Sequence, residues 1–259
     1  MFEIYKFSEV EISVFALSLI RLSSFMVVLP VFGNRLVPAS VKILLSLVMA
    51  MVMFPAIKAG TTLSPGWQDD IILLALRESV LGIFLGFLVR TMFVAVEIAG
   101  QLLGFSMGFS AVQLLNPTFG ESSTMMEEFQ TILGTLLYLS INGHHMFFEA
   151  IHKSFEMAPI GRIHMDTRAL ASVTTLVANI FIIAIKLAGP MIAVILFLNI
   201  ALGMVGRAVP QINVFVISFP VNIMVGLFIL VASIPLFMTV LEADFVQTGS
   251  QIFTYLKGF

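Results

Sequence analysis

The sequence predicts an all-α membrane protein with no β domain, in which broken helical hairpins pack into a hetero-oligomeric helical assembly. Of its 259 residues, 59% are hydrophobic and only 11% are charged, and the mean hydropathy is +1.07. Soluble domains are about half apolar and about a quarter charged. The remaining apolar surface must therefore face lipid or partner subunits. Long apolar segments and the prolines that interrupt them are the other two observations behind this prediction.

Eight apolar segments follow one another along the chain. They cover Ile12–Phe32, Val41–Ile57, Ile71–Val96, Ile98–Leu115, Phe129–Ile141, Leu170–Ala188, Met191–Val205 and Ile212–Leu241. A bilayer span needs about 20 apolar residues, so some of these segments are long enough and others are short. Residues 71–115 are nearly continuous and would reach about 65 Å as one helix, which is too long for a single span.

Five prolines lie at or inside these segments: Pro30, Pro55, Pro190, Pro220 and Pro235. Proline removes a helix hydrogen bond. Unwound backbone at membrane depth survives only where it is buried in protein or lines a wet cavity. We therefore expect helices broken near membrane depth, with an extensive helix–helix interface, rather than a row of clean spans.

Composition excludes several functions. The net charge of −2 gives no basic surface for nucleic acid, and the absence of cysteine excludes disulfides and thiolate sites. His145, Glu149 and His152 share one helical face, but a di-iron site needs a second Glu-x-x-His and two more glutamates. We predict no metal, no cofactor and no enzyme activity. The first apolar segment follows acidic residues rather than a basic n-region, so we expect it to be retained and not cleaved as a signal peptide.

Charged residues in or beside the apolar segments are candidates for function, because each costs at least about 2.5 kcal/mol in a membrane. They are Arg21, Arg77, Glu78, Arg90, Glu97 and Arg207. Arg90 and Glu97 share one helical face but are separated by a rise of about 10 Å, so a partner from another helix or subunit is an equal alternative. A structural pair, a snorkelling side chain and a proton relay all stay open.

Glycines recur at every fourth residue in two sets, Gly82 and Gly86, then Gly100, Gly104 and Gly108. Such spacing leaves one helix face nearly bare, and small residues let apolar helices approach closely. We predict helix packing for the first pair. For the second set a hinge is the alternative, since glycine weakens a helix by up to about 1 kcal/mol.

The second set runs into an apolar, glycine-containing loop at residues 106–119. On the residues alone, this loop is either an ordinary helix end or a flexible plug across a pore. The candidate plug residues are Phe109, Ser110, Val112, Gln113, Leu114, Leu115, Asn116, Pro117 and Phe119.

Several blocks resemble the FliR family of flagellar export-gate proteins, which has a related subunit in virulence injectisomes. The most specific is Arg207-Ala-Val-Pro210-Gln211-Ile-Asn213-Val-Phe215, followed by Phe219-Pro220. Arg21…Pro30-Val-Phe-Gly33, the second glycine set and Ile141-Asn142-Gly143-His144 also match. Together these blocks cover nearly the whole chain in the right order, and the Asn142-Gly143-His144 tripeptide favours the flagellar branch.

The resemblance implies a core subunit of the type III export gate in the bacterial inner membrane, within the flagellar basal body. About one copy would assemble with FliP and FliQ homologues, beside FlhB and FlhA, into a channel for unfolded flagellar subunits. It further implies a FliP-like part at residues 1–165, with a polar central loop at about 142–168, and a FliQ-like hairpin at 166–259. By the same resemblance, residues 106–119 correspond to the plug of the channel.

Two other functions are alternatives to this one. A secondary transporter would place a site near Arg90 and Glu97, but the inverted repeats that would support it are not evident in the sequence. A bare structural anchor would predict that secretion tolerates loss of these charges and of the loop.

Overall fold

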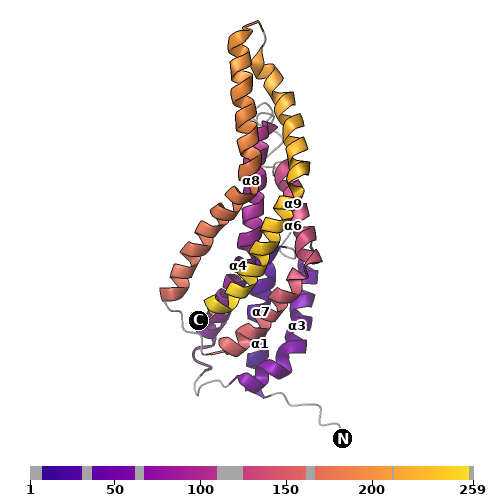
Figure 1. Ribbon diagram of the computed structural model, residues 1–259. Helices are drawn as coiled ribbons and strands as arrows, with labels where there is room; N and C mark the ends of the chain where they lie inside the picture. Colours follow the sequence, from indigo (N-terminus) through magenta and orange to yellow (C-terminus); the bar gives the residue numbers. More distant parts are fainter. Residues whose placement is uncertain are drawn as a thin grey trace. The chain divides into compact units, whose positions relative to one another are not determined.

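The computed structural model describes residues 8–30, 37–61, 67–109, 125–161, 167–211 and 213–256. Seven helices and no strands occur within these ranges (Figure 1). The helices are α1 (Glu9–Val28), α3 (Ala39–Gly60), α4 (Ile71–Met107), α6 (Met125–Ser140), α7 (Gly143–Met157), α8 (Thr167–Ala208) and α9 (Val214–Leu256). The all-α prediction is confirmed.

Within the described ranges, five helices are long and apolar enough to cross a membrane. They are α1, α3, α4, Thr174–Ala208 of α8 and Val214–Ser250 of α9. The predicted membrane protein is therefore confirmed as well. Most of the described residues of the apolar segments lie in these helices and in α6, which with 16 residues is shorter than a bilayer span.

The prediction of broken helices is wrong at four of the five prolines. Helix α1 does end at Val28, two residues before Pro30, but α3 continues through Pro55. Helix α4 runs unbroken for 37 residues, α8 continues through Pro190 for 42 residues, and α9 continues through Pro220 and Pro235 for 43 residues. In an apolar environment, leaving the helix would expose more backbone than proline itself frees, so the helix bends and continues. Figure 1 shows α8 as a bent helix.

The expected polar loop at 142–168 is also wrong over its first half, where α7 forms. This helix follows Asn142, whose backbone is left-handed with φ 56°. Its buried residues are Gly143, Phe147, Ala150, Ile151, Ser154 and Phe155. Their spacing of three and four is that of one helix face. The polar composition of the other face hid the helix in the sequence.

The chain forms two compact units. Unit 1 comprises residues 1–91, 142–176 and 247–259, and unit 2 comprises residues 92–141 and 177–246. These units are defined by contacts within this chain. The predicted division into FliP-like residues 1–165 and FliQ-like residues 166–259 concerns likeness to other subunits and stays a prediction.

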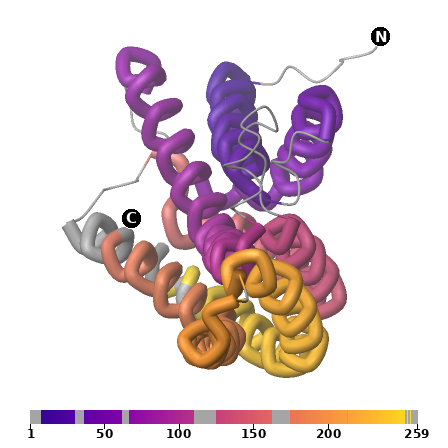
Figure 2. The backbone as a smooth tube through the Cα atoms, turned by 90° about the horizontal axis from the view of Figure 1, so that it is seen from above, coloured from indigo at the N-terminus to yellow at the C-terminus, as the bar shows by residue number. Residues whose placement is uncertain are grey.

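In unit 1, helices α1 and α3 pack side by side (Figure 2). They are antiparallel, because the first turn of α1 contacts the last turn of α3. Helix α1 begins with a capping box, in which Ser8 and Glu11 each accept a hydrogen bond from the other's backbone N–H. The Phe15 and Phe54 rings meet edge to face, with centroids 5.6 Å apart. Glu11, in the first turn of α1, also forms an ion pair with Lys58, in the last turn of α3.

In unit 2, an aromatic cluster joins α4, α6 and α9. The rings of Phe93, Tyr138 and Phe245 have centroids 5.5 to 5.8 Å apart, and all three side chains are fully buried. Helix α8 ends at Ala208 and α9 begins at Val214, and the two helices form a hairpin (Figure 1). The Asn222 amide donates to Asn199 Oδ1 at 2.9 Å across this hairpin.

Candidate functional site: a glycine-packed helix and a buried ion pair

The first glycine pair of α4 lies directly against α1. A Cβ atom at Gly82 would collide with the carbonyl oxygen of Arg21 and would lie 3.0 Å from Ser24 Cβ. At Gly86 it would lie 2.7 Å from Val28 Cβ. Both glycines are buried. Any larger residue at either position would force the two helices apart.

In the second glycine set, Gly100 faces α6. A Cβ atom at Gly100 would collide with Glu127 Cα, so α4 approaches the backbone of α6 at this point. Gly104 is buried one turn further along α4. The contacts of Gly100 are made with backbone atoms, which have little freedom to move aside.

Gly108 has a different role, because it does not continue the helix. Its φ is +89°, in the region that favours glycine, and it follows the last residue of α4. Its N–H donates to the Phe105 carbonyl at 3.1 Å, and a Cβ atom would lie 3.0 Å from the Phe219 ring of α9. Gly108 therefore ends α4 beside the α8–α9 hairpin, and the regular spacing of the glycines did not reveal this change.

Arg21 and Glu78 form a buried ion pair between α1 and α4. Arg21 Nε donates to Glu78 Oε2 at 2.6 Å, and the two side chains are 0% and 1% exposed. Charged side chains are almost never buried so completely unless they are paired. A buried charge that lost its partner would be strongly destabilising.

The remaining donors of Arg21 reach the C-terminal end of α7. Nη1 donates to the carbonyl and hydroxyl oxygens of Ser154 at 3.0 and 3.2 Å, and Nη2 donates to the Ala158 carbonyl at 2.9 Å. The guanidinium carbon lies 4.2 Å from the centroid of the Phe155 ring. The Arg21 side chain thus binds Glu78 of α4 and also the carbonyl groups at the C-terminal end of α7. A positive charge is favoured at that end of a helix.

The other predicted charges are not part of this cluster. Arg77, Arg90 and Glu97 are half-buried along α4, and Arg207 is exposed in the last turn of α8. Sequence reasoning identified Arg21 and Glu78 separately and singled out Arg90 with Glu97 as a shared face. Arg21 lies in the middle of an apolar segment, where its charge needs an acidic partner. Searching the other apolar segments for that partner could have suggested Glu78.

The His145, Glu149 and His152 face of α7 is engaged in ordinary surface contacts. Glu149 binds Lys153 one turn on, and this ion pair holds the pKa of the Glu149 carboxyl below its usual value. The His145 ring packs on His144 with centroids 4.2 Å apart. Among the described residues, no three histidine or acidic side chains are arranged to hold a metal ion.

Comparison with known proteins decides the family. The model for "Bacterial export proteins, family 1" matches residues 12–248. The chain belongs to this family. It is 32% identical to the flagellar biosynthetic protein FliR of Bacillus subtilis over 237 residues, which cover 90% of this chain and 91% of the relative. It is 31% identical to FliR of Escherichia coli over 92% of this chain and 89% of the relative, and 28% identical to FliR of Aquifex aeolicus over 92% of both.

Membership of the export protein family confirms the resemblance to FliR that the sequence blocks indicated. Of the predicted plug residues, the structure describes only Phe109. Phe109 is half-buried beside Gly108. Ser110, Val112, Gln113, Leu114, Leu115, Asn116, Pro117 and Phe119 lie outside the described residues, so their role in the family stays a prediction.

Proposed function

We propose that this chain is a core subunit of the flagellar type III protein-export gate. With homologues of FliP and FliQ it forms the channel through which unfolded flagellar subunits are secreted. Two findings support the proposal: the chain belongs to a family of bacterial export proteins, and its relatives are named flagellar biosynthetic proteins. The chain acts by conducting protein and catalyses no reaction.

The observation that carries this proposal is the length of exposed apolar surface on α9. Phe215, Met224, Phe228 and Val246 are between 59% and 76% exposed. From residue 215 to residue 246 a helix rises about 46 Å. The hydrocarbon core of a bilayer is only about 30 Å thick.

Tilting does not remove this excess. Even at about 40° from the membrane normal, near the limit for membrane helices, the same stretch projects to about 35 Å. Apolar side chains outside the hydrocarbon core need other protein surface to cover them. Partner subunits of the gate supply that cover, so the α8–α9 hairpin is the main assembly surface of the chain.

The proposal extends to location and partners. The chain resides in the inner membrane within the flagellar basal body, at about one copy per gate, beside FlhA and FlhB. Residues 1–165 take the place of a FliP-like part and residues 166–259 that of a FliQ-like hairpin. Residues 106–119 act as the channel plug.

Native mass spectrometry tests the assembly. The tagged chain is purified in detergent with and without the FliP and FliQ homologues of the same bacterium. The expected result is one hetero-oligomer that contains a single copy of this chain. A lone monomer or a homodimer that ignores both partners would overturn the proposal.

Two matched variants test the surface. Val231→Ser changes a side chain that is 65% exposed on α9, and Val52→Ser changes one that is 75% exposed on the bilayer-length helix α3. We expect Val231→Ser to lower the yield of the hetero-oligomer and Val52→Ser to leave it unchanged. Equal yields from both variants would show that α9 is not the assembly surface.

A further inference from the structure

The tip of the α8–α9 hairpin bears a single charged side chain. Arg207 lies in the last turn of α8, and it is the only charged residue between Lys186 and Glu242 in the sequence. Arg207 is exposed. A cation is favoured near the C-terminus of a helix, which accounts for its place on α8. The helix end does not account for the apolar surroundings of this charge.

Large apolar side chains are exposed on both helices beside Arg207. On α8, Met204 is 68% exposed and Val205 is 47% exposed. On α9, Phe215 is 71% exposed and Val216 is 60% exposed. We call these four residues and Arg207 the tip surface. Exposed apolar side chains that lie together in this way mark sites of interaction with other molecules.

The hairpin holds the tip surface in a fixed arrangement. A Cβ atom at Gly206 would lie 2.6 Å from Val214 Cγ2, so the end of α8 packs closely on the start of α9. The Val216 N–H donates to Asn213 Oδ1 at 3.3 Å, which caps α9. Arg207 is therefore presented together with the apolar side chains of both helices.

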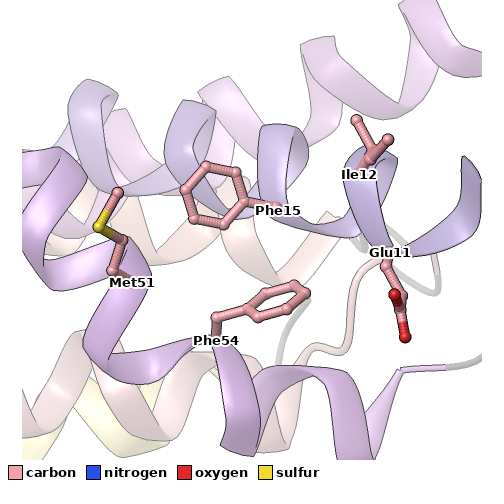
Figure 3. Close-up of a pocket in the computed structure, with 5 residues that line it drawn as sticks. All are labelled: Glu11, Ile12, Phe15, Met51 and Phe54. Carbon is pink, nitrogen blue, oxygen red and sulfur yellow. The ribbon is translucent and has the colours of Figure 1, made fainter. Parts of the chain in front are cut away.

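Elsewhere the chain itself supplies the counter-charge for a cation beside apolar surface. Between α1 and α3 in unit 1 lies a cavity with apolar walls, Phe15 and Phe54 among them, and its lining includes Glu11 (Figure 3). Glu11 forms an ion pair with Lys58. Among the residues that the structure describes, no acidic side chain forms an ion pair with Arg207.

A molecule that covers the tip surface buries Arg207 together with the apolar side chains. The guanidinium then loses its water, and charged side chains are almost never buried unless they are paired. Residues 187–241 contain no acidic residue, so the hairpin itself has no anion to offer. The molecule that covers the tip must therefore bring the negative charge.

We propose that the tip surface binds another protein whose apolar surface contains one carboxylate side chain, and that this carboxylate pairs with the Arg207 guanidinium. The planar guanidinium matches a carboxylate with two parallel hydrogen bonds. A phospholipid presents its phosphate among other polar headgroup atoms, so a cation between apolar side chains fits a protein better. This inference rests on the proposed function in one respect, namely that another subunit covers the hairpin.

A zero-length cross-link identifies the carboxylate. Arg207→Lys keeps the positive charge and introduces a primary amine. In membranes of the producing bacterium, a carbodiimide activates a carboxylate. The amine displaces the activated oxygen and forms an amide, and the carbodiimide leaves as the urea with that oxygen. Because no spacer is added, only a carboxylate in contact with the amine reacts. We expect mass spectrometry to show position 207 joined to an aspartate or glutamate of another protein.

The matched control is Gln247→Lys, which places an amine at an exposed position of α9 that is 32 residues beyond Phe215 in the sequence. It should not join to the same carboxylate. A cross-link from Arg207→Lys to this chain alone, or no cross-link at all, would overturn the proposal. So would bound phosphatidylglycerol that is lost in Arg207→Gln, because the cation would then serve a lipid phosphate.

Charge variants measure what the contact contributes to assembly. Loss of one member of a buried interface ion pair weakens binding by more than tenfold. At limiting partner concentration, we expect Arg207→Gln to form at least about tenfold less hetero-oligomer than the unaltered chain. Arg207→Glu should form still less, and Arg207→Lys should recover most of the loss.

The two proposals fail in different ways. An Arg207→Glu chain that assembles as well as the unaltered chain would overturn the ion pair and leave the proposed function intact. An unaltered chain that ignores the FliP and FliQ homologues would overturn the proposed function. The cross-link in native membranes would still show whether another protein places a carboxylate against position 207.

Discussion

The contact of α1, α4 and α7 in unit 1 and the α8–α9 hairpin in unit 2 differ in how they hold apolar helices together. In unit 1, Arg21 alone makes four hydrogen bonds to Glu78, Ser154 and Ala158. In the hairpin, the Asn222 amide donates to Asn199 and the Ser233 hydroxyl donates to the Met191 sulfur. The first region is complete within the chain. The second leaves large apolar side chains exposed, and the assembly with other subunits that we propose would cover them.

The same comparison holds for the glycines. Gly82 and Gly86 lie against α1, and Gly100 lies against the backbone of α6. Gly203 of α8 has nothing within 4 Å of where its Cβ atom would be. Glycine is thus closely packed at these positions of α4, whereas Gly203 of α8 faces open space. The other end of the range on α8 is Gly206, where a Cβ atom would lie 2.6 Å from Val214 Cγ2.

The largest effect is expected from Arg21→Ala. This change leaves the Glu78 carboxylate buried without its cation and removes the donors to the end of α7. Breaking a buried ion pair in this way costs about 3–5 kcal/mol. We expect a large fall in Tm, measured by scanning fluorimetry in detergent.

Replacing both charges separates the ion pair from the packing. Arg21→Met combined with Glu78→Met removes the uncompensated charge, so we expect it to recover much of the Tm lost in Arg21→Ala. An Arg21→Ala protein with the Tm of the unaltered chain would show that the cluster does not stabilise unit 1.

Gly100→Ala should have the next largest effect. The added methyl group collides with backbone atoms of Glu127 in α6, and overpacking of this kind costs about 1–3 kcal/mol. The matched control is Gly203→Ala, where the methyl group meets open space and alanine favours the helix by about 0.5–1 kcal/mol. Comparing the two Tm values tests the contrast directly, and equal values would remove it.

A smaller effect is expected from Asn222→Leu in the hairpin. The variant loses the 2.9 Å hydrogen bond to Asn199 but keeps a side chain of similar size. Interhelical hydrogen bonds in membrane proteins average about 0.6 kcal/mol. We therefore expect a Tm change much smaller than that of Arg21→Ala. A loss as large as that of Arg21→Ala would mean that one polar bond holds the hairpin.

The smallest effect concerns Glu149 on the exposed face of α7. Its pKa is lowered by the Lys153 hydrogen bond, so the contribution of this pair to stability is present above the unfolded pKa of about 4.3. That contribution is lost as pH falls through the folded pKa. Lys153→Met should raise the pKa of Glu149 toward its usual value, as measured by NMR titration of labelled glutamate. An unchanged pKa would contradict the assignment.

The sequence predicted the membrane helices because their signal is local. Continuous apolar runs were enough to locate α1, α3 and much of α4, α8 and α9, whereas the hairpin at 166–259 was expected only from the resemblance to FliR. Helix α7 could have been found as well, because Phe147, Ala150, Ile151 and Ser154 have helical spacing. Its polar outer face was instead interpreted as a loop.

Features that depend on distant contacts could not be found in this way. Arg21 and Glu78 lie 57 residues apart, and no local pattern selects one partner among the acidic residues of the chain. The three prolines of the hairpin were misjudged because proline breaks helices in water, where freed carbonyls find solvent. In an apolar environment the freed carbonyl groups find no solvent, so the helix keeps its remaining hydrogen bonds and continues past the proline.

Those prolines also determine where the helices of the hairpin can bend. An unbroken helix is a stiff rod, and each proline deletes one bond of its ladder and concentrates bending at one place. Pro190 gives α8 one such joint, and Pro220 and Pro235 give α9 two. The α8–α9 hairpin can therefore bend at three defined residues while its apolar surface stays the same.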